Sequence, residues 1–247
     1  MEPLDNWVWG ALTGLHQAFA DGSPPAVRYQ PDVSVFAALP DVITPDAWNQ
    51  LAVLVGPSDG TVLFRAEIGP LPAGWTESSF GVAVQMIGPA RGAPRPAANR
   101  RATAGVDVAI LTPTDVPAMG ALVERTEPGP FEVRTIELGT YVGARVDGEL
   151  VAMAGQRMRI DGYTEISAVC TDAEHRGRGL AGVLLDILID EIHDRGDIPF
   201  LHVLSSNTVA VGRYASLGFE PRRNAEPTWV TPPRDRRDSG RPVGPTD

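Results

Sequence analysis

The stretch Arg176-Gly177-Arg178-Gly179-Leu180-Ala181 stands between a strand-like run and a helix-like run, and it decides the fold. Two glycines within four positions let the backbone turn sharply and let a bulky anion come close. The first amides of a helix that starts at Gly177 lack partners inside that helix and lie at the positive end of its dipole. The turn is therefore a candidate pyrophosphate site, and its two arginines add positive charge.

Other interpretations compete with this one. A P-loop is excluded, because all 21 basic residues are arginine and that motif needs a lysine. A dinucleotide-binding turn follows an early strand, whereas the strand before this turn comes late in its domain. On the turn alone, an ordinary glycine-containing loop with two solvated arginines stays open.

Composition and charge limit the classes of function. The chain has 247 residues, of which 43% are apolar, enough for one large domain or two ordinary ones. The net charge of −10 disfavours nucleic acid and anionic membrane surfaces and weakly favours a cationic acceptor such as an amine. A single cysteine, no signal-peptide pattern and no long apolar stretch predict a cytoplasmic protein without a membrane partner. The histidines and the cysteine lack metal-ligand spacing, so we expect no metal.

Two segments rich in proline and arginine divide the chain. Residues 89–103 (PARGAPRPAANRRAT) predict a linker, and residues 232–247 predict a disordered tail. The division predicts an N-terminal α/β region at residues 1–88 and a second domain at residues 104–231.

Apolar spacing predicts an α+β domain with a central mixed sheet in the second half. Asp147-Gly148 between two alternating runs predicts a hairpin. The expected strands there are 106–111, 139–146, 149–158, 163–171, 199–204 and 226–230, and the expected helices are 114–125, 177–195 and 208–217. In the first half we expect helices at 5–20 and 44–55 and strands at 61–67 and 80–87.

A second motif lies downstream, where residues 207–219 read NTVAVGRYASLGF. This motif, together with Arg176, Gly179 and Ala181 in the turn, resembles the GCN5-related N-acetyltransferase (GNAT) family over roughly residues 106–223. The run from Glu165 to Thr171 before the turn is similar to the FR47-like, glycine N-acyltransferase-related subgroup. The resemblance implies a mixed sheet flanked by helices. The N-terminal region lies outside the match and is either a separate addition or a degenerate copy of the same fold.

The resemblance also implies a chemistry, which is direct transfer of acetyl from acetyl-CoA to a primary amine. Tyr214 stands where the family has its general acid, although a core tyrosine would have the same helical spacing. Glu165 stands at the offset of a general base that works through a water, with an exposed strand residue as the alternative, and His202 could replace it. The residues implied for acetyl-CoA are Val169, Cys170, Thr171, Arg176, Gly177, Arg178, Gly179, Leu180, Ala181 and Asn207.

Several alternatives stay open at the level of sequence. The same fold could bind acyl-CoA as an inactive sensor or scaffold, or it could transfer longer acyl groups. The acceptor could be a small molecule or a peptide amine. The N-terminal region could shape the acceptor site or form a homodimer.

Overall fold

The computed structural model describes residues 2–57, 59–93 and 105–233. The helices in these ranges are α1 (Trp7–Leu12), α2 (Pro45–Val55), α3 (Val116–Thr126), α4 (Leu180–Asp194) and α5 (Thr208–Ser216). The first strands are β1 (Ala20–Ser23), β2 (Ala26–Tyr29), β3 (Phe36–Ala38), β4 (Thr61–Arg65), β5 (Thr76–Ser79) and β6 (Ala83–Ile87). The remaining strands are β7 (Asp107–Ile110), β8 (Tyr141–Val146), β9 (Glu149–Ile160), β10 (Tyr163–Thr171), β11 (Ile198–Leu204) and β12 (Glu220–Thr231).

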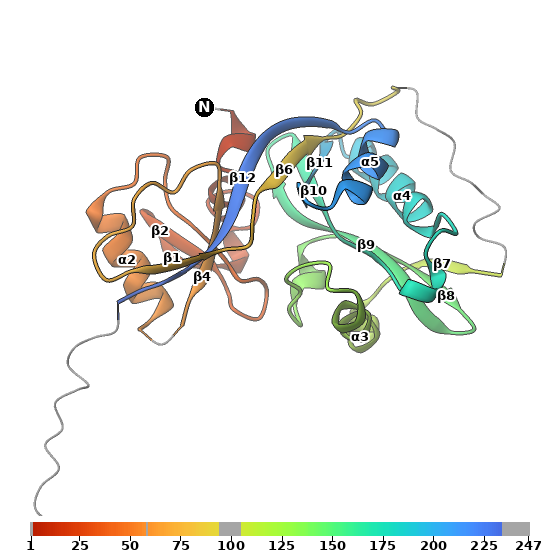
Figure 1. The fold of residues 1–247 in the computed structure, drawn as a ribbon, viewed down its shortest axis with the longest axis horizontal. Coiled ribbons are helices and arrows are strands. Elements are labelled where there is room, and N and C mark those ends of the chain that lie inside the picture. Colours follow the sequence, from red (N-terminus) through yellow and green to blue (C-terminus); the bar gives the residue numbers. More distant parts are fainter. Residues whose placement is uncertain (1, 58, 94–104, 234–247) are drawn as a thin grey trace, which may run out of the picture.

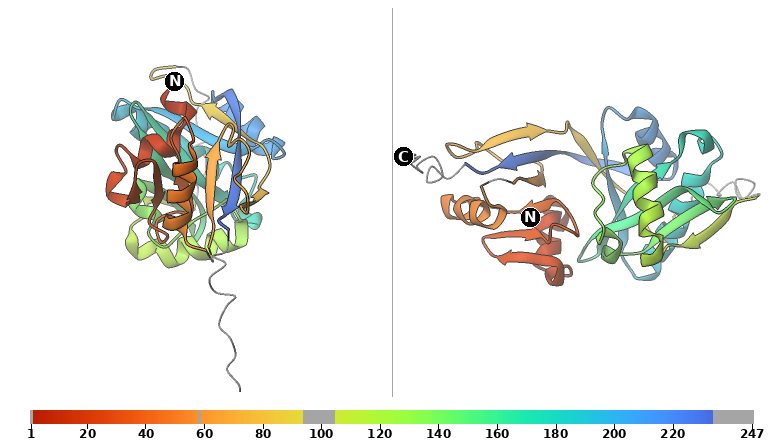
Figure 2. Two further views of the ribbon diagram at one scale, coloured as in Figure 1. Left: turned by 90° about the vertical axis from the view of Figure 1, so that its left-hand side faces the viewer. Right: turned by 90° about the horizontal axis from the view of Figure 1, so that it is seen from below.

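These strands form one hydrogen-bonded series, β1-β2-β3-β4-β12-β6-β11-β10-β9-β8-β7, with β5 paired to β12 at its side (Figure 1). The series folds into two lobes, which we call the N-terminal lobe (β1 to β5 with α1 and α2) and the C-terminal lobe (β7 to β11 with α3 to α5). Figure 2 shows β6 and β12 running side by side from one lobe to the other. Strands from both sides of the predicted boundary after residue 88 therefore belong to one hydrogen-bonded sheet.

The two lobes repeat one strand topology. In the N-terminal lobe, β1, β2 and β3 are antiparallel neighbours, and β3 runs parallel to β4 through the crossover helix α2. In the C-terminal lobe, β8, β9 and β10 are antiparallel neighbours, and β10 runs parallel to β11 through α4. A further antiparallel strand completes each lobe, and it comes from the other half of the chain. Strand β6, from the first half, pairs with β11 of the C-terminal lobe, and β12, from the second half, pairs with β4 of the N-terminal lobe. This arrangement is what a degenerate copy of the same fold would give.

The core has separate clusters on the two faces of the C-terminal sheet. Helix α4 packs on one face, where apolar residues such as Leu184 and Leu188 are fully buried. The N-terminal lobe packs on the other face, where Trp7 and Phe36 join Phe200 and Ile160 in one buried cluster. This burial of apolar surface holds the lobes together and fixes what covers the sheet.

Three element predictions need correction. The helix expected at residues 5–20 ends at Leu12 and is followed by a 3-10 turn (Gln17–Phe19) and β1. Glycine at position 14 weakens a longer helix. The carbonyl of Trp9 accepts both the N–H of Thr13 at 2.9 Å and its hydroxyl at 2.7 Å at the end of α1. Helix α4 begins at Leu180 rather than Gly177, because both glycines of the turn are left-handed.

The third correction concerns β12, which was expected at residues 226–230 and covers Glu220–Thr231. Pro221 hid the first half of this strand, since proline is uncommon inside sheets. Its first half pairs with β6 and its second half pairs with β4 and β5.

Only the first part of the predicted linker, residues 89–93, lies within the described residues, and it is fastened to the end of α4. His193 Nε2 donates to the Pro89 carbonyl at 2.9 Å, and Arg91 donates to the His193 carbonyl at 2.6 Å and to Asp194 at 3.0 Å. Residues 94–103 and the predicted tail beyond residue 233 lie outside the described residues. Within the described part of the chain, a helix with the length and apolar character of a membrane span is not found.

Candidate active site

The glycine-rich turn joins β10 to α4 and leaves a series of backbone amides open. Gly177 and Gly179 have φ of 76° and 84°, the left-handed region that glycine adopts without strain. The amides from Gly177 to Ala181 have no hydrogen-bond partner among the described residues, and no side chain there caps α4. Consecutive free N–H groups at a helix N-terminus fit the diphosphate expected for this turn.

Three arginines surround this turn. Arg176 and Arg178 are exposed, and Arg176 Nε donates to the carbonyl of Thr171 at 3.1 Å. Arg213 of α5 was missed from the sequence. Its guanidinium lies against Gly182 of α4, where any Cβ would collide with it. The glycine at 182 therefore makes room for a third positive charge beside the turn.

The corresponding place in the N-terminal lobe, between β3 and α2, lacks such a cradle. The Thr44 hydroxyl accepts the N–H of Ala47 at 3.3 Å, and Pro45 has no N–H to offer. The features that suit a phosphate therefore belong to the C-terminal lobe alone among the described crossovers.

Strand β10 carries a β-bulge just before the turn. Ala168 and Val169 lie opposite a single residue of β9, Ala154, and Ala168 has a φ of 52°. A bulge takes backbone groups out of the regular ladder, and it lies at Val169, one of the residues that the resemblance implied for acetyl-CoA. Cys170 and Thr171 return to the ladder, opposite Met153 and Ala152. Burial raises the pKa of the Cys170 thiol, which suits a packing role rather than nucleophilic attack.

Two residues of the downstream motif lie at α5. Asn207 is its N-cap, and its Oδ1 accepts the N–H of Ala210 at 3.1 Å while its side-chain amide nitrogen has no partner among the described residues. Tyr214 is 9% exposed, and its hydroxyl has no hydrogen-bond partner in the described part of the chain. Burial, and then the nearby Cys170 thiol, raise the pKa of Tyr214 to about 12. The motif thus brings a protonated hydroxyl next to the bulged strand.

Glu165 has no exposed surface, in contrast to the exposed position considered from the sequence. Arg157 of β9 donates from Nε to Oε2 at 2.9 Å and from Nη2 to Oε1 at 2.8 Å, and His202 Nδ1 lies 2.7 Å from Oε1. Burial raises the pKa of Glu165, but Arg157 and His202 outweigh it and bring the pKa to about 2. A carboxylate with this pKa is a weak proton acceptor, so its base role stays a prediction without support from its surroundings.

Glu165 belongs to a chain of hydrogen bonds that we call the polar row. The row takes one side chain from each of five neighbouring strands, β12, β6, β11, β10 and β9. Arg222 donates to Gln85 Oε1 at 2.9 Å, and Gln85 Nε2 lies 3.1 Å from His202 Nε2. Since Nε2 of Gln85 can only donate, His202 accepts there and carries its proton on Nδ1, toward Glu165. The members of the row are Arg222, Gln85, His202, Glu165 and Arg157.

Aromatic rings of the N-terminal lobe cover the polar row. Trp7 stacks on His202 with ring centroids 4.2 Å apart, and Phe36 lies under the Arg157 guanidinium at 4.8 Å. Burial lowers the pKa of His202 against the pull of Glu165, so we take this histidine as neutral. Sequence reasoning missed Arg157 because its partner is eight positions away, on another strand.

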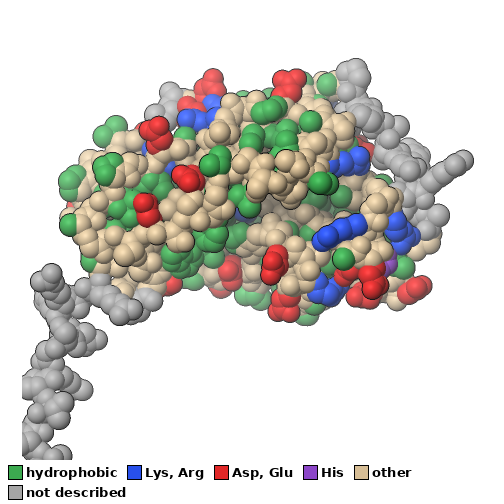
Figure 3. Space-filling model, in the orientation of Figure 1, with side chains coloured by type: hydrophobic (Ala, Val, Ile, Leu, Met, Phe, Trp, Pro, Cys, Tyr) green, Lys and Arg blue, Asp and Glu red, His purple; other side chains and the backbone are tan. Residues whose placement is uncertain are grey.

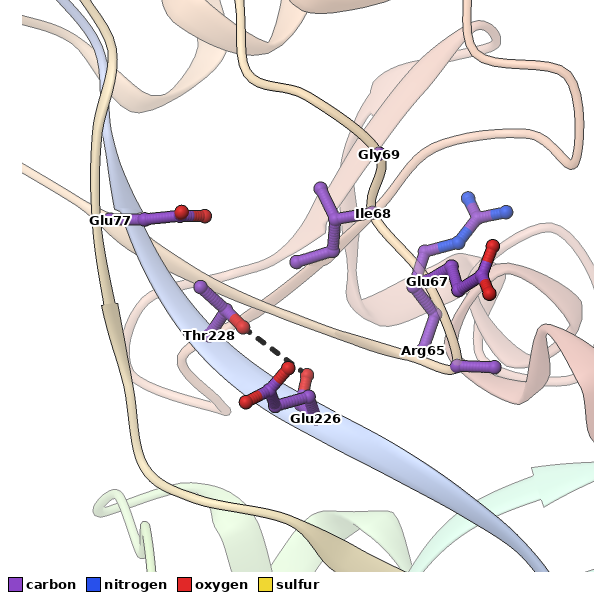
Figure 4. Close-up of a pocket in the computed structure, with 8 residues that line it drawn as sticks. Arg65, Glu67, Ile68, Gly69, Glu77, Glu226 and Thr228 are labelled. Atoms are coloured by element: carbon purple, nitrogen blue, oxygen red, sulfur yellow. Dashed lines mark hydrogen bonds between the residues drawn. The ribbon is translucent and has the colours of Figure 1, made fainter.

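An open hollow of about 330 Å³ lies in the N-terminal lobe, apart from these residues (Figure 4). Glu67, Glu77 and Glu226 line it, with Thr228 of β12 donating to the Glu226 carbonyl at 3.4 Å. No group of three or more potential ligands that could hold a metal ion was found among the described residues. On the face shown in Figure 3, charged side chains of both signs gather over the C-terminal lobe.

Comparisons with known proteins show the family. The family model described as FR47-like protein matches residues 141–230, which include the bulge, the turn and Tyr214. The [ribosomal protein bS18]-alanine N-acetyltransferase of Salmonella typhimurium is 32% identical over 130 residues, which cover 49% of this chain and 87% of that protein. The N-alpha-acetyltransferase RimI of Mycobacterium tuberculosis is 36% identical over 109 residues, covering 41% of this chain and 68% of the relative.

A solved structure extends the likeness to the N-terminal lobe. The crystal structure of a putative acetyltransferase of the GNAT family from Novosphingobium aromaticivorans has a TM-score of 0.80 and 37% identity, and the match covers 94% of this chain and 99% of that one. The N-terminal lobe is therefore shared with at least one other protein. Because of its similarity to these proteins, the chain belongs to the GCN5-related N-acetyltransferase family and is an N-acetyltransferase.

Proposed function

We propose that the protein transfers acetyl from acetyl-CoA directly to a primary amine. The observation that carries the proposal is the run of unpartnered amides from Gly177 to Ala181, beside Arg176, Arg178 and Arg213. These groups would hold the diphosphate of acetyl-CoA. Asn207 and the backbone of Cys170 and Thr171 would bind its pantetheine arm, and Leu180 would begin the helix below the diphosphate.

Each remaining step of the reaction has a candidate group in the chain. The N–H of Val169 at the bulge would donate to the thioester oxygen, where negative charge develops during acyl transfer. The Tyr214 hydroxyl, with its pKa of about 12, would keep its proton at neutral pH and give it to the departing thiolate. The amine must be neutral to attack, and its proton would leave to water.

We propose that Glu165 is a positioning residue. It neutralises Arg157 and accepts the Nδ1 proton of His202, and it thereby holds both side chains in place. Removal of the amine's proton by Glu165 through a water would need a carboxylate of higher pKa than about 2. The Glu165 variant described in the Discussion separates the two roles.

We propose a polypeptide N-terminus as the acceptor. The relatives in Salmonella typhimurium and Mycobacterium tuberculosis are named for an alanine of a ribosomal protein and for N-alpha acetylation. Those relatives match only about half of this chain. We propose that the N-terminal lobe helps to shape the acceptor site.

A pair of glycine variants tests the proposal. Gly177 and Gly196 both have left-handed φ, 76° and 86°, and an added Cβ meets nothing within 4 Å at either position. Ala at each would therefore cause similar backbone strain, about 1–2 kcal/mol, but only Gly177 lies at the turn. We expect Gly177→Ala to raise KM for acetyl-CoA tenfold or more and Gly196→Ala to leave it unchanged.

The wild-type protein provides the decisive readouts. Acetyl-CoA should raise the melting temperature, and peptides with a free N-terminus should release CoA in a thiol assay. Stabilisation by acetyl-CoA without release of CoA by any amine would identify an inactive sensor. Faster release from a longer acyl-CoA would identify a different acyl donor, and no stabilisation at all would refute the proposal.

A further inference from the structure

The side chain of Tyr141 crosses the sheet toward the reaction centre. Tyr141 on β8 pairs with Gly155 on β9, and Gly155 pairs with Ser167 on β10, directly before the bulge. One edge of the Tyr141 ring, with Cδ1, Cε1 and Cζ, lies against Gly155, where an added Cβ would collide with it. Because position 155 has no side chain, the ring lies flat over β9 and carries its hydroxyl toward β10. Tyr141 packs in one cluster with Ala168 of the bulge.

This hydroxyl is buried and has no hydrogen-bond partner among the described residues. Tyr141 is 1% exposed, and a buried hydroxyl without a partner loses its bond to water without replacement. Burial raises the pKa of Tyr141 far above its usual range. The hydroxyl is protonated and free to donate.

The second open donor is at the same end of the polar row. Arg157 uses Nε and Nη2 on Glu165, and Nη1 has no hydrogen-bond partner among the described residues. The Arg157 side chain is only 10% exposed. Elsewhere the row is bonded along its whole length, from Arg222 to Glu165. Arg157 Nη1 is therefore the open donor at the β9 end of the row, and the Tyr141 ring lies against Gly155, two positions before Arg157 on the same strand.

The net charge around Arg157 and Tyr141 favours a neutral oxygen acceptor over a carboxylate. Glu165 already neutralises Arg157, and His202 is neutral, so a carboxylate bound here would leave one net negative charge buried. A neutral carbonyl oxygen accepts from both donors without that penalty. Gly155, under the Tyr141 ring, pairs with Ser167, two positions before Val169, so this carbonyl would be the one next to the acceptor amine.

We propose that Tyr141 is a substrate-binding residue which, with Arg157, binds the carbonyl oxygen of the acceptor's first residue. The acceptor class is thus an α-amino acyl compound with an uncharged carbonyl, as in a peptide N-terminus. This inference rests on the proposed acetyl transfer to an amine, and it adds the group that the enzyme recognises beside that amine.

Three small probes with one carbon skeleton test the inference. Alaninamide has the neutral carbonyl, alanine has a carboxylate, and 2-aminopropane has neither. Binding of each to the CoA-saturated protein is measured by calorimetric or NMR titration, and acetyl transfer is measured separately. We expect alaninamide to bind about three- to tenfold more tightly than 2-aminopropane, the range of one or two net hydrogen bonds. Tyr141→Phe should abolish that preference.

Tyr29→Phe is the matched control. Tyr29 is also fully buried, but its hydroxyl bonds His16 Nδ1 at 2.9 Å. Its loss should lower the melting temperature and keep the preference for alaninamide, whereas Tyr141→Phe should not lower the melting temperature.

Each outcome decides one question. An equal preference in wild type and Tyr141→Phe would show that the hydroxyl binds only water, and tighter binding of alanine than of alaninamide would show a carboxylate site. Either result overturns the inference. If the binding preference holds while no amine is acetylated, the proposed function fails and the binding site stands.

Discussion

Replacing Glu165 by glutamine removes the charge that holds the polar row together. Glutamine has nearly the same shape and keeps one oxygen for Arg157 or His202, so the change is electrostatic rather than steric. It leaves the Arg157 guanidinium, 10% exposed, without a counter-ion beneath the N-terminal lobe. The other cation of the row, Arg222, keeps its own partners, Glu2 and Asp5, at 2.6 and 2.7 Å.

The size of the effect follows from this burial. Removing one partner of a buried ion pair typically costs about 3–5 kcal/mol, because the remaining charge stays desolvated. For a chain of this length, each kcal/mol shifts the melting temperature by about 2–4 °C, so we expect a decrease of roughly 6–20 °C. The double variant Glu165→Leu with Arg157→Met removes both charges and should recover most of the lost stability.

Urea unfolding and calorimetry would measure these changes, with Glu191→Gln as the control for a partly exposed carboxylate. A loss below about 1 kcal/mol, the value of a surface pair, would refute our account of the polar row. Turnover of the folded fraction separates the two proposed roles of Glu165. A positioning residue predicts a larger change in KM for the amine than in kcat, whereas a base predicts loss of kcat that a higher pH restores.

Two further predictions follow from the pKa values. Tyr214→Phe should lower kcat by about 10²–10⁴ without lowering the melting temperature, since the hydroxyl has no partner among the described residues; an unchanged kcat in a steady-state assay would contradict its acid role. The pKa of Glu165 falls from 4.5 to about 2 on folding, so its stabilisation is present above pH ~4.5 and is lost as the pH falls toward 2. This loss amounts to about 3 kcal/mol in urea titrations, and Glu165→Gln should lack it.

The parts of the site with a local cause could be predicted from sequence. The hairpin at Asp147-Gly148 forms as expected, with φ of 50° and 84°, because these residues favour that turn whatever surrounds them. The turn from Arg176 to Ala181 depends on two glycines in the same way. Tyr214 was found through a motif whose spacing follows one helix.

The parts with a distant cause could not be predicted. The burial of Glu165 depends on Arg157 and on a layer of rings from the first 65 residues, none of which is near it in sequence. Tyr141 points to the bulge because of a glycine on the next strand, and nothing in the local pattern marks that pair. The place of β6 between β11 and β12 could not be predicted either, because the residue pattern of a strand does not show which strands it will pair with.

The exchanged strands make this chain equivalent to a strand-swapped dimer whose two subunits are fused in tandem. A swapped dimer cannot come apart without breaking the hydrogen bonds between its strands. Here the twelve residues of β12 pair with β4 at one end and with β6 at the other. Expression of residues 105–233 alone would leave a vacant position beside β11 and two unpaired edges, which invite aggregation. The lobe without a phosphate cradle is therefore an obligatory part of the folding unit.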